Sequence, residues 1–125
     1  MTNYPVGDFL IQIKNAGLAK RRSVTVPKTK LIHSVAKVLV KEGYLTEVVA
    51  EKNLLRVQLS YRKKEPVLLD LKLVSRPGLR IYKKAEALKR QKGASFLIVS
   101  TPQGIVSSRQ AVKQNRGGEA IAEIW

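Results

Sequence analysis

The chain has 125 residues, 44% of them hydrophobic, which is enough to bury a core as one ordinary domain or two very small ones. It contains no Cys, which excludes disulfides, thiolate metal sites and Cys nucleophiles. Its 24 Lys and Arg against 9 Asp and Glu give a net charge of +15. This excess favours a polyanionic partner, with nucleic acid first and an anionic membrane surface as the competing interpretation.

Membrane and secretion segments are not indicated by the sequence. No apolar stretch approaches the roughly 20 residues that a membrane-spanning helix needs. The start, Met1 to Pro5, lacks the basic-then-apolar pattern of a secretory signal. We therefore expect a soluble, intracellular protein with no membrane partner.

Two helices are predicted in the first third of the chain. Apolar residues recur at helical spacing over Val6–Gly17 and predict an amphipathic helix. A short strand is expected over Ser23–Val26, after which Pro27 should open the second helix. Gly43 is well placed to end that helix in a left-handed conformation.

Two strands and a boundary are expected next. Residues 44–49 are rich in β-branched side chains, and residues 55–61 alternate apolar and polar as a half-buried strand does, with a turn at residues 52–53. The polar segment 62–66 then breaks the pattern. We place a boundary there, which makes residues 1–65 an N-terminal α/β domain.

Residues 66–125 are expected to form a second, mostly β domain with a short helix. Its predicted elements are a strand over residues 67–74, a turn at Pro77-Gly78, a helix over 83–90, a strand over 95–99, a polar loop over 100–104, a short helix capped by Ser107 or Ser108 that runs to about Asn115, and a last strand ending at Trp125. The chain is therefore predicted to be an α+β protein of two small parts.

Three cations in the second half are candidates for phosphate binding. Arg109, Lys113 and Arg116 are spaced by four and three residues, so a helix would place them along one face. The alternative is an ordinary solvated helix face. The net charge of the chain favours binding over that alternative.

Tyr82 is a candidate for base stacking. Four cations surround it along the chain, namely Arg76, Arg80, Lys83 and Lys84. An aromatic ring among cations offers a stacking plane next to phosphate ligands. Tyr82 could equally be a core residue.

A polar loop supplies the remaining candidates. Ser100 and Thr101 follow an apolar strand, so their hydroxyls are expected at the end of a sheet, and Gly104 would let the backbone approach a ligand closely. The alternative is that this segment is only a good turn. Glu119, after Gly117-Gly118, could pair with a nearby Arg or hold the polar loop in place.

No catalytic or metal-binding constellation is predicted. His33 is the only histidine and has no nearby Asp to suggest a triad, so a structural or surface role is expected for it. Closely spaced carboxylate pairs, phosphate-cradling Gly-rich loops with a Lys, and Gly-x-Ser-x-Gly motifs are absent from the sequence. We therefore expect no enzyme, no cofactor and no small-molecule substrate.

Three ordered motifs resemble the small-subunit ribosomal protein S8 family. They are Val74–Tyr82, Ser100–Ile105 and Gly117–Glu119. In the amino half, Ile13–Ala16 and Val38–Tyr44 resemble the same family. The resemblance therefore covers nearly the whole chain.

The resemblance implies a two-part α/β protein of the small ribosomal subunit. Its carboxyl part would grip a helix with an irregular internal loop in the central domain of the small-subunit rRNA, and the protein would act early in assembly. Neighbouring small-subunit ribosomal proteins would be further partners, and its own messenger RNA is a candidate partner. The expected location is the cytoplasmic ribosome, with an organellar ribosome as the alternative.

The resemblance also assigns RNA contacts to individual residues. In the family, a loop, a Tyr and a Glu make the central contacts, and their counterparts here are Tyr82, Ser100, Thr101, Gly104 and Glu119. The family commonly has a Ser where this chain has Pro102, so one hydroxyl and one backbone N–H are missing. The rival interpretation is a basic protein that coats nucleic acid without sequence preference, and an RNA-modifying enzyme is a more distant third.

Overall fold

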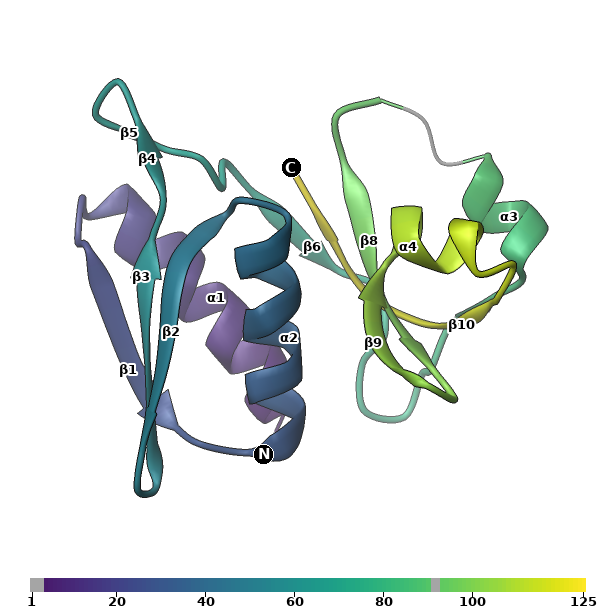
Figure 1. Ribbon diagram of the computed structural model, residues 1–125, viewed down its shortest axis with the longest axis horizontal. Helices are drawn as coiled ribbons and strands as arrows, with labels where there is room; N and C mark the ends of the chain where they lie inside the picture. The colour runs from purple at the N-terminus through teal and green to yellow at the C-terminus, as the bar shows by residue number, and fades with distance from the viewer. Residues whose placement is uncertain (1–3, 91–92) are drawn as a thin grey trace. The chain divides into compact units, whose positions relative to one another are not determined.

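The computed structural model describes residues 4–90 and 93–125, which form two compact units. One unit is Pro5–Asp70, and the other comprises Tyr4 with Leu71–Trp125. Both combine helices with antiparallel strands (Figure 1), so the predicted α+β class is confirmed. The division between the two units lies after Asp70, and the domain boundary expected after residue 65 stays a prediction. No helix within the described ranges is long and apolar enough to cross a membrane.

The unit Pro5–Asp70 is a three-stranded sheet covered on one face by two helices. Its elements are α1 Pro5–Leu18, β1 Ser23–Pro27, α2 Lys30–Lys41, β2 Leu45–Glu51, β3 Leu54–Leu59, β4 Tyr61–Arg62 and β5 Glu65–Pro66. The sheet order is β1-β3-β2, and along β3 exposed and buried residues alternate strictly. Only one face of the central strand is therefore buried, and α1 and α2 cover that face (Figure 1).

The second helix begins later than expected. Pro27 is the last residue of β1, where it pairs with Leu54, so the prediction that it opens α2 is wrong. The side chain of Thr29 instead accepts a hydrogen bond from the backbone N–H of Ile32 and caps the helix. The predicted helix end is confirmed, because Gly43 has a φ of +87° immediately after the last turn.

The polar segment 62–66 is more regular than predicted. Strands β4 and β5 pair as a short hairpin, and its two turn residues, Lys63 and Lys64, have φ values of +52° and +68°. Positive φ at both central positions matches the twist of a tight hairpin. The strand expected over residues 67–74 is largely wrong, because residues 67–70 pair with no described strand and β6 begins only at Leu71.

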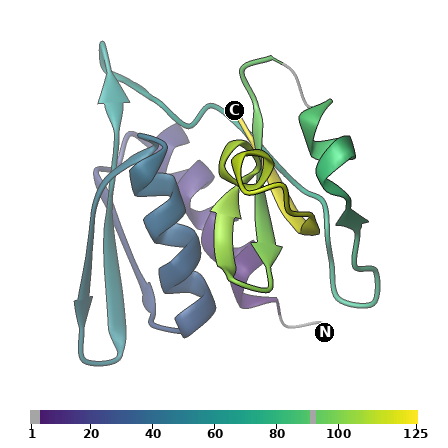
Figure 2. The same ribbon diagram turned by 45° about the vertical axis from the view of Figure 1, so that its right-hand side comes forward.

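The unit containing Leu71–Trp125 is built around its last strand. Its elements are β6 Leu71–Leu73, β7 Tyr82–Lys83, α3 Ala85–Lys89, β8 Phe96–Thr101, β9 Gly104–Ser107, α4 Ser108–Lys113 and β10 Gly118–Ile124. The sheet order is β6-β10-β8-β9, and β7 also pairs with β10. Helix α4 packs on β8 and β9 (Figure 2), and α3 packs against α4. The buried cluster that these helices share with the sheet comprises Leu88, Leu97, Val99, Ala111 and Ala120.

In this unit the predicted helix and the predicted polar loop are shorter than expected, and the strand between them is longer. The helix expected over residues 83–90 is confined to Ala85–Lys89. The strand expected to end at Val99 continues through Thr101, and Gly104 begins the unpredicted β9, so the turn itself is only Pro102 and Gln103. Hairpin pairing between β8 and β9 satisfies backbone groups that a free loop would leave to solvent.

Candidate nucleic-acid interface

Three of the predicted site residues lie side by side on adjacent strands. Glu119 on β10 is directly opposite Tyr82 on β7 and directly opposite Ser100 on β8. Directly opposed residues of antiparallel strands point to the same face of a sheet. Val99 and Ala120, the next pair along, point to the other face and are fully buried with α3 and α4. Tyr82, Glu119 and Ser100, which we call the sheet row, therefore lie on the face opposite these helices.

Tyr82 is a surface residue. It is 71% exposed, which excludes the alternative that Tyr82 is a core residue. The pairing of β7 with β10 fixes the backbone on which the ring is carried. An exposed aromatic ring offers a face on which a base of RNA can stack.

The structure separates Thr101 from Gly104. The Thr101 hydroxyl is bonded within the protein, whereas the backbone at Gly104 is open. The Thr101 hydroxyl donates to the Gly104 carbonyl, 2.8 Å away, and accepts from the backbone N–H of Gln103, at 3.2 Å. Thr101 is buried, so its hydroxyl serves the turn. Gly104 has a φ of +130°, and nothing lies within 4 Å of where a Cβ would be. The backbone at Gly104 is therefore open to close approach.

The Glu119 carboxylate is paired within the protein. Its Oε2 lies 3.4 Å from Nη1 of Arg80, so the predicted pairing with an Arg is confirmed. The Arg80 guanidinium also lies over the ring of Tyr4, with its Cζ 5.5 Å from the ring centroid. Burial raises the pKa of the Tyr4 phenol above its usual value. Glu119 thus orients a cation beside the sheet row.

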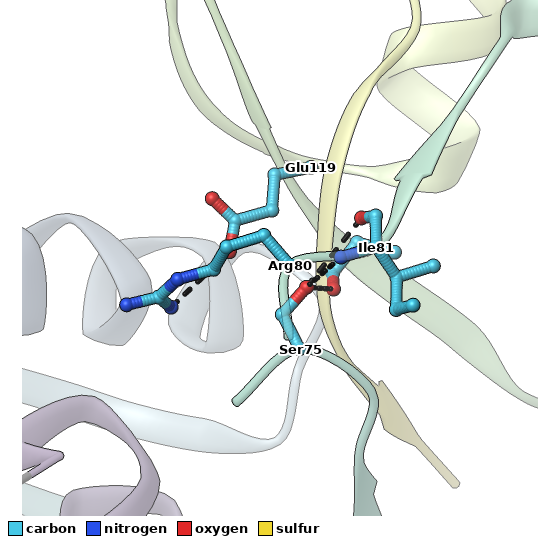
Figure 3. A network of polar contacts seen from close by, with 5 residues as sticks. Ser75, Arg80, Ile81 and Glu119 are labelled. Carbon is cyan, nitrogen blue, oxygen red and sulfur yellow. Dashed lines mark hydrogen bonds and ion pairs between the residues drawn. The ribbon is translucent and has the colours of Figure 1, made fainter. Parts of the chain in front are cut away.

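Ser75 fixes the segment that carries Arg80 and Tyr82, a role that the sequence did not indicate. The buried Ser75 hydroxyl donates to the Ala120 carbonyl at 2.6 Å and accepts from the Ile81 N–H at 3.0 Å (Figure 3). The N–H of Ala120 donates in turn to the Ile81 carbonyl, at 2.9 Å. These bonds hold residues 80–82 against β10. The only available signal was a Ser at the end of an apolar run.

Two glycines let the strands at the sheet row approach closely. A Cβ on Gly118 would lie 2.1 Å from the Ser100 carbonyl oxygen, and one on Gly117 would lie 2.4 Å from the Lys83 carbonyl oxygen. Both distances are shorter than any real contact, and both atoms are backbone. Glycine is therefore required here by space rather than by an unusual φ.

The three predicted phosphate ligands do not share one helix face. Arg109 and Lys113 are exposed on α4, but this helix ends at Lys113 and Asn115 has a φ of +54°. The N–H of Arg116 closes the helix end by donating to the Ala111 carbonyl, so the expectation of three cations on one helix is wrong for Arg116. Because α4 packs on the face opposite the sheet row, these cations and the row are two separate groups.

The grouping of metal-ligating side chains and the surroundings of the single histidine can both be described. Between residues 4–90 and 93–125, no three His, Asp or Glu side chains are grouped as a metal ion would need. His33 lies on α2 in a basic environment. Burial, together with the positive charges of Lys37 and Lys28, lowers its pKa below the usual value.

Comparison with known proteins points to one family. The model of the family described as ribosomal protein S8 matches residues 4–125. A small ribosomal subunit protein uS8 of Nitratidesulfovibrio vulgaris is 39% identical over 126 residues, spanning 100% of both chains. The uS8 protein of Nostoc punctiforme is 41% identical over 130 residues, or 98% of both chains. The uS8c protein of Guillardia theta is 38% identical over 132 residues, again 100% of both.

Proposed function

The chain belongs to the ribosomal protein S8 family, whose members are structural proteins of the small ribosomal subunit, and we propose that it binds the central domain of the small-subunit rRNA. It is not an enzyme. Binding would occur early in subunit assembly, beside neighbouring small-subunit proteins. Its own messenger RNA, if it carries a similar helix, is a further target. The place of action is the ribosome.

The observation that carries this proposal is the sheet row. It combines an exposed aromatic ring at Tyr82, a hydroxyl at Ser100 and a cation, Arg80, that Glu119 holds nearby. Within the described part of the chain, the Ser100 hydroxyl makes no hydrogen bond to protein, which leaves it available to RNA. Regular A-form RNA hides its base edges in a narrow groove, so such a surface suits an irregular, widened helix.

Affinity and specificity would come from different groups. The cations of α4, Arg109 and Lys113, would bind phosphates and release counterions without regard to sequence. The Ser100 hydroxyl and the open backbone at Gly104 would contact groups that only the irregular helix presents. Thr101 would act indirectly, by holding the turn that positions both.

Competition binding tests the proposal. A labelled fragment of the central rRNA domain is bound to the protein, and the unlabelled fragment is compared as competitor with an unrelated duplex of equal length at one salt concentration. We expect the unrelated duplex to compete at least about a thousandfold less well. Equal competition would instead identify a protein that coats nucleic acid without preference.

A further inference from the structure

A second basic surface occurs in the unit Pro5–Asp70. It is a pocket of about 480 Å³, which we call the lysine pocket. The lining residues that matter for its chemistry are Lys28, Lys30, Lys37, Lys52, His33 and Asn53. None of them belongs to the sheet row or to α4, so the function proposed above leaves this pocket unassigned.

Hydrogen bonds fix the walls of the lysine pocket. Its residues come from the β1–α2 connection, the first turns of α2 and the β2–β3 turn. The N–H of Lys28 donates to the carbonyl of Asn53, 2.8 Å away, which ties the connection to the turn. The side-chain cap at Thr29 fixes where α2 begins. The three segments therefore present their side chains from one stable frame.

The charge in the pocket is uncompensated. None of the lining residues is acidic, and within the described residues none of the four lysines forms an ion pair. Elsewhere in the same unit, Lys14 pairs with Asp70 and Lys20 pairs with Glu65. The lysines of the pocket repel one another, and burial together with the charges of Lys37 and Lys28 lowers the pKa of His33. An anion in the pocket would relieve this repulsion.

We propose that the lysine pocket binds phosphate groups of an RNA backbone, as a second RNA contact in the amino half of the chain. The inference rests on the proposed function, because it takes the bound RNA as the source of the phosphates. Lysines are compact charges on flexible stems, which suits phosphates better than base edges. Apart from the His33 imidazole, the lining holds no aromatic side chain on which a base could stack. The contact is therefore one of position and affinity rather than of sequence.

His33 is a built-in reporter for this site. It is the only histidine of the chain, so one imidazole signal follows the pocket in the full protein by NMR. The pH titration of that signal is recorded without RNA and with the central-domain rRNA fragment bound. We expect the pKa of His33 to rise when RNA binds, because phosphates offset the lysine charges. A His33 signal that titrates identically with and without RNA contradicts the pocket assignment.

Charge-removing variants supply the binding test. Lys37→Gln and Lys52→Gln each remove one charge from the pocket, and Lys41→Gln removes one from the same helix outside it. We expect each pocket variant to weaken rRNA binding by roughly threefold to tenfold at low salt, and Lys41→Gln to bind like the parent. Circular dichroism checks that all three variants are folded.

The outcomes separate the two proposals. If the parent binds rRNA specifically but the pocket variants behave like Lys41→Gln, the pocket inference fails and the proposed function stands. If the rRNA fragment does not bind the parent, both fail. If inorganic pyrophosphate shifts the His33 signal and the bound RNA does not, the pocket is a site for small anions and its assignment to RNA is wrong.

Discussion

The hydroxyl of Thr101 donates a hydrogen bond to the backbone carbonyl of Gly104, 2.8 Å away, across the turn between β8 and β9. Ser100, one residue earlier, faces the opposite side of the strand and lies beside Glu119. The two adjacent hydroxyls, which the family resemblance groups together, therefore have different roles. One stabilises the turn, and the other is presented on the sheet row.

Stability measurements should separate these two hydroxyls. Thr101→Val removes the partner of the Gly104 carbonyl and of the Gln103 N–H, so we expect a loss of about 1 to 2 kcal/mol in the free energy of unfolding. Ser100→Ala should change it by less than about 0.5 kcal/mol, since no intramolecular bond is lost. Urea unfolding of both variants checks this. Equal stabilities would mean that the turn does not depend on Thr101.

Removing the hydroxyl of Ser75 should have a larger effect. Ser75→Ala leaves the Ile81 N–H and the Ala120 carbonyl without their buried partner, which should cost about 1 to 3 kcal/mol of unfolding free energy. Ser34→Ala is the control for the unfolding measurement alone, because that hydroxyl bonds only an exposed helix carbonyl. Loss of affinity for the rRNA fragment under folding conditions would further show that Ser75 positions the segment before Tyr82.

A Cβ at Gly118 should not be tolerated. Gly118→Ala would place that atom 2.1 Å from the Ser100 carbonyl oxygen, so β8 and β10 must separate and unfolding free energy should fall by about 3 kcal/mol or more. Gly43→Ala provides the contrast. It has open space and only an unfavourable φ of +87°, so a cost of about 1 kcal/mol is expected. Comparable thermal shifts for the two variants would contradict the steric explanation.

Local chemistry explains which elements the sequence predicted. The apolar spacing of α1, the alternation of β3, the Gly43 cap and the Ser107 cap each depend on near neighbours in the chain, and the structure has them all. Pro27 was misassigned because a Pro suits both a first helical turn and an edge strand, and pairing with Leu54 decided for the strand.

The site needed information that no local pattern contains. The sequence placed Tyr82, Ser100 and Glu119 among the candidates, but their alignment in one row depends on the register of three strands. Ser75 was missed because its partners, Ile81 and Ala120, are brought to it only by the fold. Arg116 was misplaced because the left-handed Asn115 ends α4 without a glycine.

The salt dependence of RNA binding should reveal the phosphate contacts of α4. Each phosphate contact contributes a slope of roughly −0.7 to −0.9 to log affinity against log salt. Arg109→Gln and Lys113→Gln should each flatten the slope by about one contact and weaken cognate and unrelated RNA alike. Affinities measured between low and moderate salt supply the slopes. A loss confined to the cognate RNA would assign these residues to specific recognition instead.

Replacement of Tyr82 tests the sheet row most directly. Because the ring is 71% exposed, Tyr82→Ala should leave unfolding free energy almost unchanged while removing the stacking surface, at a cost of about 1 to 3 kcal/mol in binding to the rRNA fragment. Tyr82→Phe keeps the ring and should bind nearly like the parent. The matched control is Leu79→Ala, a 60% exposed side chain at the preceding turn that offers no aromatic plane.

The pattern of these three variants distinguishes stacking from simple surface contact. If stacking carries the interaction, Tyr82→Phe and Leu79→Ala retain affinity and only Tyr82→Ala loses it. If Tyr82→Phe loses as much as Tyr82→Ala, the phenol hydroxyl makes the contact and the ring only carries it. If all three bind like the parent, Tyr82 is an exposed residue beside Glu119 with no part in RNA binding, and the sheet row must be reduced to Ser100 and the cation that Glu119 orients.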